Sequence, residues 1–379
     1  MHQRERQTGQ QRVAELDGVR ALAILLVVVW HYLGATGGPD STQWKLFIFG
    51  RTGVDLFFVL SGYLITGILL ANAGASNYFS TFYARRSFRI LPIYFGMVAV
   101  YLVGRQLGGS APALFGGTLP WWSYIVGVQN IWMTIEQSYG ALWLAATWSL
   151  AIEEQFYLLF PLVVYFASPR TLLRFLVALL VLCPIARIIA YILGDGFGYY
   201  VLMPLRADIL AIGALIALLQ FRDAVTQPLR RAFQIVFWLT ACFFPFFAWA
   251  FDKSDFNMAV WGHSYLVAFY GSAVFMVLDN KGAPQLAPLR SRMAAFFARI
   301  SYALYLVHGP VLILTFLAVR ASPEIKTAGG LLLTACAFAI SVAICWASYL
   351  FIEGPLIRMA HQRFRYVGSN VQAYGFSAR

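Results

Sequence analysis

The stretch VRALAILLVVVWHYLGA, residues Val19 to Ala35, has the length and apolar character of a membrane-spanning helix, yet it holds a histidine in its interior. An ionisable side chain inside hydrocarbon costs about 2–3 kcal/mol on insertion scales, so His31 is a candidate functional residue. Arg20 opens the run, and eleven residues at roughly 100° each return the helix to within about 20° of its starting direction. Arg20 and His31 therefore share one face, about 16 Å apart along the axis. This spacing favours a long ligand lying along the helix, with a polar contact between two helices as the alternative interpretation.

The composition of the whole chain indicates an all-α polytopic membrane protein. Of its 379 residues, 60% are hydrophobic and 12% are charged, a charged share about half that of an ordinary soluble domain. Apolar stretches recur along the sequence, whereas no polar stretch is long enough for a second soluble domain. We therefore expect one transmembrane domain over residues 1–365 and a mobile cytoplasmic tail over residues 366–379.

The arginine clusters predict the orientation of the helices. We expect about ten membrane helices, near residues 19–36, 49–71, 90–107, 142–167, 171–193, 203–221, 232–251, 259–279, 300–319 and 328–352. Ten spans place both termini on one side, and the basic clusters then fall on that same side, which the positive-inside rule makes cytoplasmic. The net charge of +12 is thus explained by an inner membrane protein, and no nucleic acid partner is expected.

Residues 120–135 do not fit this alternation. The segment is apolar and aromatic, with two tryptophans and a tyrosine near its start. Such residues are typical of the membrane interface, so we expect one extra interfacial or re-entrant helix here. If it spanned the membrane instead, the orientation of every later helix would invert.

Two adjacent acids lie near the middle of the fourth predicted helix. Glu153 and Glu154 come about eleven residues after the predicted extracytoplasmic end of this helix. His31 lies about twelve residues from the predicted cytoplasmic end of the first helix. The depths coincide, which favours a His31–Glu153 pair in which the carboxylate orients a general base. In the alternative interpretation, each acid only satisfies a polar neighbour.

A dense cationic patch opens the third predicted helix. Arg85, Arg86 and Arg89 lie at the predicted cytoplasmic face, together with Arg20. Arginine forks match phosphate oxygens, so a donor that bears several phosphates is the predicted ligand. The alternatives are the positive-inside rule itself and binding of anionic lipid headgroups.

Other polar residues inside apolar runs are candidates for binding the acceptor or an oxyanion. Ser61 is either a nucleophile or a packing residue beside Gly62. Arg206 and Asp208 either bind acceptor hydroxyls or form a structural salt bridge. Spacings of four and three residues place a further set on one helical face, which suggests a lined cavity: Ser301, Tyr305 and His308.

Seven strings, taken in order, resemble the membrane acyltransferase-3 family. They are LDGVRALAILLVVVWH, GVDLFFVLSGYLIT, ARRSFRILPIY, TWSLAIEEQFYLLFP, RADILAIGALIA, ISYALYLVH and the final EGP. The family's patterns fall on the pair Arg20 and His31, on the pair Arg86 and Arg89, and on Trp148, Ser149, Leu150 and Glu153. The resemblance covers nearly the whole chain and is closest to family members without a fused hydrolase-like domain.

The resemblance implies an enzyme that moves an acyl group, usually acetyl, from a coenzyme A thioester to a hydroxyl. A cell-surface or lipid-linked carbohydrate is the first expected acceptor, and a hydrophobic small molecule such as a macrolide is the second. Acetyl-CoA is then a co-substrate, and no tightly bound cofactor is expected. The cysteines lack the spacing of metal ligands, so no metal is expected either. The oligomeric state is open, with a homodimer as one option.

The spacing and the resemblance together predict a mechanism. The donor phosphates bind Arg20, Arg85, Arg86 and Arg89, and the pantetheine arm extends along the first helix to place the thioester beside His31. His31 accepts the proton of the acceptor hydroxyl, Glu153 orients its ring, and Arg206, Ser301 or Tyr305 stabilises the oxyanion. A variant route passes the acyl group covalently through His31 or Ser61. The rival hypotheses are a transporter or flippase with a proton relay, and a structural membrane protein without chemistry.

Overall fold

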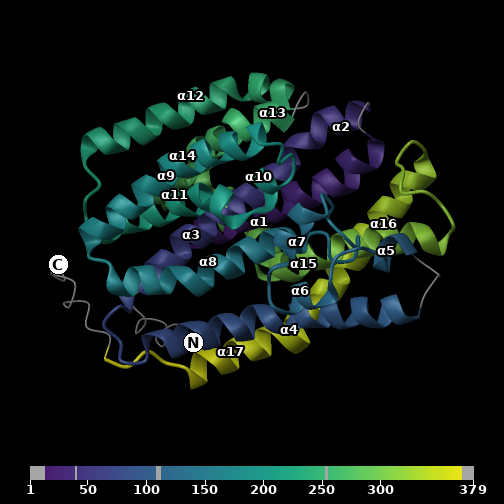
Figure 1. Cartoon of the computed structure of the whole chain (residues 1–379), viewed down its shortest axis with the longest axis horizontal. Coiled ribbons are helices and arrows are strands. Elements are labelled where there is room, and N and C mark those ends of the chain that lie inside the picture. Colours follow the sequence, from purple (N-terminus) through teal and green to yellow (C-terminus); the bar gives the residue numbers. More distant parts are fainter. Residues whose placement is uncertain (1–12, 39–40, 108–111, 252–254, 369–379) are drawn as a thin grey trace.

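The computed structural model describes residues 13–38, 41–107, 112–251 and 255–368, and every regular element among these residues is a helix (Figure 1). The long helices are α1 Ala14–Val29, α3 Gly53–Ala71, α4 Tyr78–Gln106, α8 Thr147–Phe166, α9 Pro169–Ile192, α11 Met203–Phe221, α12 Gln227–Phe251, α14 His263–Asp279, α15 Arg292–Ala318 and α16 Ala328–Ser348. Shorter turns of helix continue or connect them: η2 Trp30–Gly34, η3 Ala35–Gly37, α2 Thr42–Phe47, η4 Ile48–Thr52, α5 Pro112–Phe115, α6 Trp121–Ile125, α7 Gln129–Ile135, α10 Gly198–Val201, α13 Asp255–Asn257, η5 Met258–Gly262, η6 Pro284–Arg290, η7 Tyr349–Glu353 and α17 Gly354–Arg363.

The expected all-α polytopic fold is confirmed. In the described part of the chain, nine helices are long and apolar enough to cross a membrane, against about ten predicted. The difference is α12, on which the predicted span 232–251 falls. It has 25 residues, or about 37 Å of helix, which exceeds the roughly 30 Å of a hydrocarbon core. It is not among the nine, and the last side chains of this helix lie outside the described ones.

The segment 120–135 does not span, as expected. It forms two short helices, α6 with five residues and α7 with seven, and the chain turns between them at Gly127. The φ angle of Gly127 is +73°, a left-handed conformation that glycine adopts without steric cost. Neither helix approaches the length of about 20 residues that a membrane crossing requires.

Local sequence signals set the start of several long helices. The hydroxyls of Ser168, Ser291 and Thr327 precede α9, α15 and α16, and each accepts a hydrogen bond from the backbone N–H three residues later. Such N-caps satisfy one of the four N–H groups that a helix start leaves without a partner. The cap at Ser291 fixes the beginning of α15, the helix that carries four of the polar residues described below.

Helices α3 and α11 pack closely at the centre of the bundle. A Cβ atom on Gly62 would lie 2.0 Å from the carbonyl oxygen of Leu210, and one on Gly213 would lie 2.0 Å from that of Val59. Glycine is therefore required at both positions, as is common where membrane helices touch through their backbones. This contact fixes α3 against α11 and also holds Ser61 in place beside Gly62.

Helix α17 packs against α4 (Figure 1), and Asn77, which precedes α4, donates to the carbonyl oxygen of Arg365 at 2.7 Å. Arg20 lies in the first half of α1, and Arg86 and Arg89 lie in the first half of α4. These three arginines come together, and we call the end of the bundle where they lie the basic end. At the start of the expected tail, the carbonyl oxygen of Val367 accepts from Ser76 N at 3.0 Å, and its N–H donates to Asn77 at 2.9 Å. Residues 369–379 lie outside the described residues.

Candidate active site

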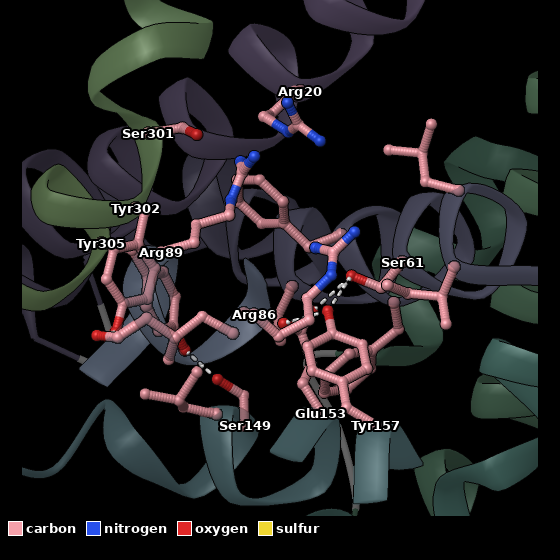
Figure 2. A pocket seen from close by; sticks show the side chains of 17 residues that line it. Arg20, Ser61, Arg86, Arg89, Ser149, Glu153, Tyr157, Ser301, Tyr302 and Tyr305 are labelled. Atoms are coloured by element: carbon pink, nitrogen blue, oxygen red, sulfur yellow. Dashed lines mark hydrogen bonds between the residues drawn. The ribbon is translucent and has the colours of Figure 1, made fainter. Parts of the chain in front are cut away.

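A cavity opens among α1, α3, α4, α8 and α15 (Figure 2). Together with the open solvent at its mouth, it encloses about 760 Å³ free of protein atoms. Its polar lining comes from five helices and consists of Arg20, Ser61, Arg86, Arg89, Ser149, Glu153, Tyr157, Ser301, Tyr302 and Tyr305. Seven of the twelve predicted site residues are thus brought together: Arg20, Ser61, Arg86, Arg89, Glu153, Ser301 and Tyr305.

Helical periodicity explains which side chains reach the cavity. On α8, Ser149, Glu153 and Tyr157 follow one another at intervals of four residues, and such residues lie above each other on one face. Their stripe covers about 12 Å of the helix axis. Tyr157 was not among the predicted site residues, although its spacing from Glu153 was a usable signal.

Three arginines form the cationic mouth of this cavity. The guanidinium of Arg86 lies 5.6 Å from the ring centre of Tyr157, and Arg20 has an ion-pair contact of 3.8 Å with Asp17. In Figure 2 the side chains of Arg20, Arg86 and Arg89 point into the same space. A guanidinium stacked on a ring keeps its N–H edges available, so this mouth can bind an anionic group through several donors.

Arg85 is a correction to the predicted cationic set. Its Nε donates to the carbonyl oxygen of Phe364 at 2.7 Å, and its guanidinium lies 5.1 Å from the ring centre of Tyr366. Arg85 and Arg86 are consecutive and therefore point about 100° apart on α4, whereas Arg86 and Arg89 share a face. Arg85 holds the C-terminal segment against α4 and is not among the residues that line the cavity.

Glu153 belongs to a compact hydrogen-bonded group. Its Oε1 accepts from the Ser61 hydroxyl at 2.7 Å, and its Oε2 accepts from the Tyr157 hydroxyl at 2.9 Å. Tyr157 also lies 3.1 Å from the Ser61 oxygen. This group gives the cavity a fixed carboxylate one helical turn deeper than the level of Arg86.

The predicted contact between Glu153 and His31 is wrong. The two residues have similar depths, but α3 packs against both α1 and α8 and separates them. His31 instead contacts α15: its Nδ1 lies 3.2 Å from Nε2 of His308 and 2.8 Å from the carbonyl oxygen of Val27. Two residues at a similar depth in different helices therefore need not face each other.

The His31–His308 pair lies beyond the inner end of the cavity. Neither histidine is among the lining residues, and Tyr305, which is, has its ring centre 6.1 Å from that of His308. The Tyr305 hydroxyl is 2.5 Å from the Ser149 oxygen and donates to the carbonyl of Ala146 at 3.1 Å. These contacts close the cavity at the level of Tyr305 and Ser149 (Figure 2).

The backbone at His31 departs from an α-helix. Trp30–Gly34 forms a π-turn, in which the N–H of Ala35 bonds the carbonyl of Trp30 five residues earlier. Such turns are frequent at functional sites because the extra residue changes the direction of the side chains. The prediction that Arg20 and His31 share a face assumed a rotation of roughly 100° per residue. This rotation applies along α1 and ends at the π-turn.

Arg206 and Asp208 were predicted as acceptor-binding candidates near the surface, and the structure supports the alternative of structural salt bridges. Each is only 1% exposed. Arg206 pairs with Asp55 of α3, and Arg187 Nη2 of α9 lies 2.8 Å from Asp208. Two ion pairs thus join α11 to its neighbours outside the cavity. The sequence offered no signal for which acid pairs with which arginine, because the partners are distant along the chain.

We expect Arg206→Ala to destabilise the protein by about 3–5 kcal/mol, because it leaves the buried Asp55 carboxylate without its partner. Thermal unfolding in detergent measures the effect, with the exposed Arg174→Ala as control. The double variant Arg206→Leu with Asp55→Leu should recover part of the loss, since no charge is then left unpaired. A stable Arg206→Ala protein that has lost its activity would instead favour the predicted ligand-binding role of Arg206.

Ser301 lines the cavity near the basic end. Its hydroxyl donates to the carbonyl of Ala298 at 3.0 Å, one turn earlier on α15. Tyr305 lies one turn further in on the same face, so only Tyr305 among the predicted oxyanion donors reaches the inner end.

Comparison with known proteins identifies the family. A family model described as an acyltransferase domain, of the acyltransferase-3 type, matches residues 13–350. The chain is 30% identical over 370 residues to the peptidoglycan O-acetyltransferase OatA of Listeria monocytogenes, covering 91% of this chain and 56% of that protein. It is 27% identical over 379 residues to the O-acetyltransferase OatA of Staphylococcus aureus, covering 93% of this chain and 58% of the relative.

A shorter match is 38% identical over 187 residues to the putative peptidoglycan O-acetyltransferase YrhL of Bacillus subtilis, and it covers 44% of this chain and 27% of that protein. No solved structure matches the chain. The chain spans a little more than half the length of the two OatA relatives. The family model nevertheless covers every helix that lines the cavity, and the chain therefore belongs to the acyltransferase-3 family of membrane proteins.

Proposed function

We propose that this protein is a membrane O-acetyltransferase that takes an acetyl group from acetyl-CoA and transfers it to a hydroxyl of a cell-surface carbohydrate. The observation that carries the proposal is the cavity with three arginines at its mouth and a line of hydrogen-bonding side chains leading inward. The relatives are O-acetyltransferases, and the one from Listeria monocytogenes is a peptidoglycan O-acetyltransferase, which supports acetyl as the transferred group and peptidoglycan as the model for the acceptor.

The charge of the cavity mouth favours this donor. Arg20, Arg86 and Arg89 offer guanidinium forks for the phosphates, which Arg binds in a bidentate manner. The pantetheine arm then extends along the stripe on α8, past Glu153 and Ser61, which can accept and donate hydrogen bonds to its amides. Glu153 is thereby assigned to binding the donor, in place of the role beside His31 that its depth had suggested.

The chemistry is proposed for the inner end of the cavity. The thioester must pass Tyr305 and Ser149 for its carbonyl to approach His31. His31 removes the proton from the acceptor hydroxyl, the hydroxyl oxygen attacks the thioester carbonyl carbon, and the C–S bond breaks as coenzyme A leaves. The coenzyme A thiolate then takes the proton from His31. Once released from its contact with Ser149, the Tyr305 hydroxyl donates to the oxyanion in this proposal.

The basic end faces the cytoplasm in this proposal. It collects the loops that are rich in arginine, and acetyl-CoA is a cytoplasmic metabolite. The protein is then a multi-pass protein of the cytoplasmic membrane, with an acceptor that approaches from the opposite end, near His31.

Membrane vesicles of defined orientation test the proposal. Labelled acetyl-CoA is added to inside-out and right-side-out vesicles that contain the full chain, and free coenzyme A and labelled peptidoglycan fragments are measured. Coenzyme A release is expected only where acetyl-CoA reaches the basic end. Release from the opposite side would overturn the assigned orientation. Absence of both binding and release in either orientation, with an ion flux, would favour the transporter hypothesis.

A further inference from the structure

We propose that His308 is a positioning residue that holds His31 in the tautomer with its proton on Nδ1, so that Nε2 carries the lone pair of the base. The inference rests on the proposed function, because it assigns His308 a task in the same acetyl transfer. It replaces the Glu153 carboxylate, which is bonded to Ser61 and Tyr157, with a neutral imidazole as the partner of the base.

Three contacts determine where the protons lie. Nδ1 of His308 is 2.9 Å from the carbonyl oxygen of Leu304, which can only accept, so this nitrogen carries the proton of the neutral ring. Nε2 of His308 is then an acceptor, and it faces Nδ1 of His31 at 3.2 Å. Nδ1 of His31 must therefore be the donor.

The second contact of His31 gives the same assignment independently. Its Nδ1 lies 2.8 Å from the carbonyl oxygen of Val27, which again accepts only. One N–H is thus shared between an imidazole nitrogen and a carbonyl oxygen. The opposite tautomer would place a nitrogen lone pair against the Val27 oxygen and would leave the base nitrogen Nε2 protonated.

His308 is held rigidly enough for this task. It is 1% exposed, its ring is tied to Leu304, and its own carbonyl accepts from the Tyr32 hydroxyl at 2.9 Å. The same hydroxyl lies 2.9 Å from the Ser341 oxygen, which links α15 to α16 and to the π-turn that carries His31. A partner fixed by burial and by a second hydrogen bond is the usual way to hold a functional histidine in one orientation.

His308 is 1% exposed and its Nε2 faces His31, which is only partly buried, so His308 acts through His31 and does not touch the substrate. When His31 takes a proton from the acceptor, its Nδ1–H remains directed at the His308 lone pair and the Val27 carbonyl. The imidazolium is then stabilised by two neutral acceptors. This arrangement has the logic of a base with an orienting partner, with a neutral group in the place that an aspartate occupies in a serine-protease triad.

The test compares His308→Leu, which removes the acceptor, with His308→Gln, whose side-chain amide oxygen has a similar reach and can accept from His31. Both are made in the full chain in detergent. The rate of coenzyme A release and the KM for acetyl-CoA are measured, and acetyl-CoA binding is measured separately. Nitrogen-15 NMR of histidine-labelled protein reports the tautomer of His31, whose signals are assigned by their loss in His31→Gln.

We expect wild-type His31 to show the Nδ1–H tautomer in the absence of any substrate. In His308→Leu we expect a mixture of tautomers and a kcat about 10- to 100-fold lower, the usual cost of losing a residue that orients a functional group, with KM within a few-fold of wild type. His308→Gln should restore most of the kcat and the single tautomer. If His308 had only a structural role, His308→Leu would lower the stability of the protein. It would not explain a changed tautomer of His31 or the recovery of kcat in His308→Gln.

An Nε2–H tautomer of His31 in the wild type would overturn the inference, even if acetyl transfer is confirmed. So would a His308→Leu protein that is folded and fully active. If the leucine variant does not fold, the wild-type spectrum and the glutamine variant still decide. Failure of the proposed function is distinct, because it appears as absent acetyl-CoA binding and release in the wild type, whatever the tautomer.

Discussion

His31→Ala is expected to lower the rate of coenzyme A release and of acetyl transfer by about 100- to 10,000-fold, the usual contribution of a general base. The imidazole has no replacement within the pair, because His308 uses Nδ1 to bond Leu304 and is only 1% exposed. Binding of acetyl-CoA should stay close to wild type, since Arg20 at the mouth lies eleven residues, or about 16 Å of helix rise, from His31.

The control for this experiment is His361→Ala, which removes an exposed histidine of α17. It should leave transfer unchanged. Stopped assays with labelled acetyl-CoA give the rate, and equilibrium binding gives the affinity. Full transfer by His31→Ala would exclude both the general-base route and the covalent route through His31, and would turn attention to Ser61.

Arg86→Ala is expected to weaken acetyl-CoA binding by roughly 10- to 100-fold, because a charge-assisted hydrogen bond contributes about 1.5–3 kcal/mol and 1.4 kcal/mol is a factor of ten. Arg86 is chosen because its guanidinium is held over the Tyr157 ring and is thus ordered before the ligand arrives. Binding should also weaken as salt concentration rises, since the interaction is between charges at an open mouth.

Arg85→Ala is the matched control for Arg86→Ala. The two residues are adjacent in sequence and carry the same charge, but Arg85 is bonded to Phe364 and is not among the lining residues. It should lower the thermal stability of the C-terminal segment and leave acetyl-CoA affinity within a few-fold of wild type. Equal losses of affinity in both variants would mean that the net charge of the basic end, and not this cavity, attracts the donor.

Most of the fold could be predicted from local properties. Within the described part of the chain, nine of the ten expected spans are long and apolar enough to cross a membrane, and the tenth falls on the long helix α12. Hydrophobic length is the decisive signal in lipid, because every backbone polar group must be satisfied within its own helix. The short helices α6 and α7 were likewise indicated by the aromatic composition of their segment.

The part of the site that depends on residues of a single helix could be predicted from helical periodicity. Spacings of three and four residues placed Arg86 with Arg89 and Ser301 with Tyr305, and all four line the cavity. The same rule separates Arg85 from Arg86, which share a charge and a place in the sequence but not a face of α4. Residues on different helices were paired by estimated depth, and that estimate failed for Glu153 and His31.

The sequence by itself determined that the chain is a helical membrane protein, which end of the bundle is basic, and which residues share a face of one helix. These properties depend on composition and on the fixed 3.6-residue period of the α-helix. Only the tertiary structure decided that Glu153 bonds Ser61 and Tyr157, that Arg206 pairs with Asp55, and that His308 faces His31. Such partners depend on the rotation and neighbours of each helix, which are set by close packing across the bundle, such as the glycine contact of α3 with α11.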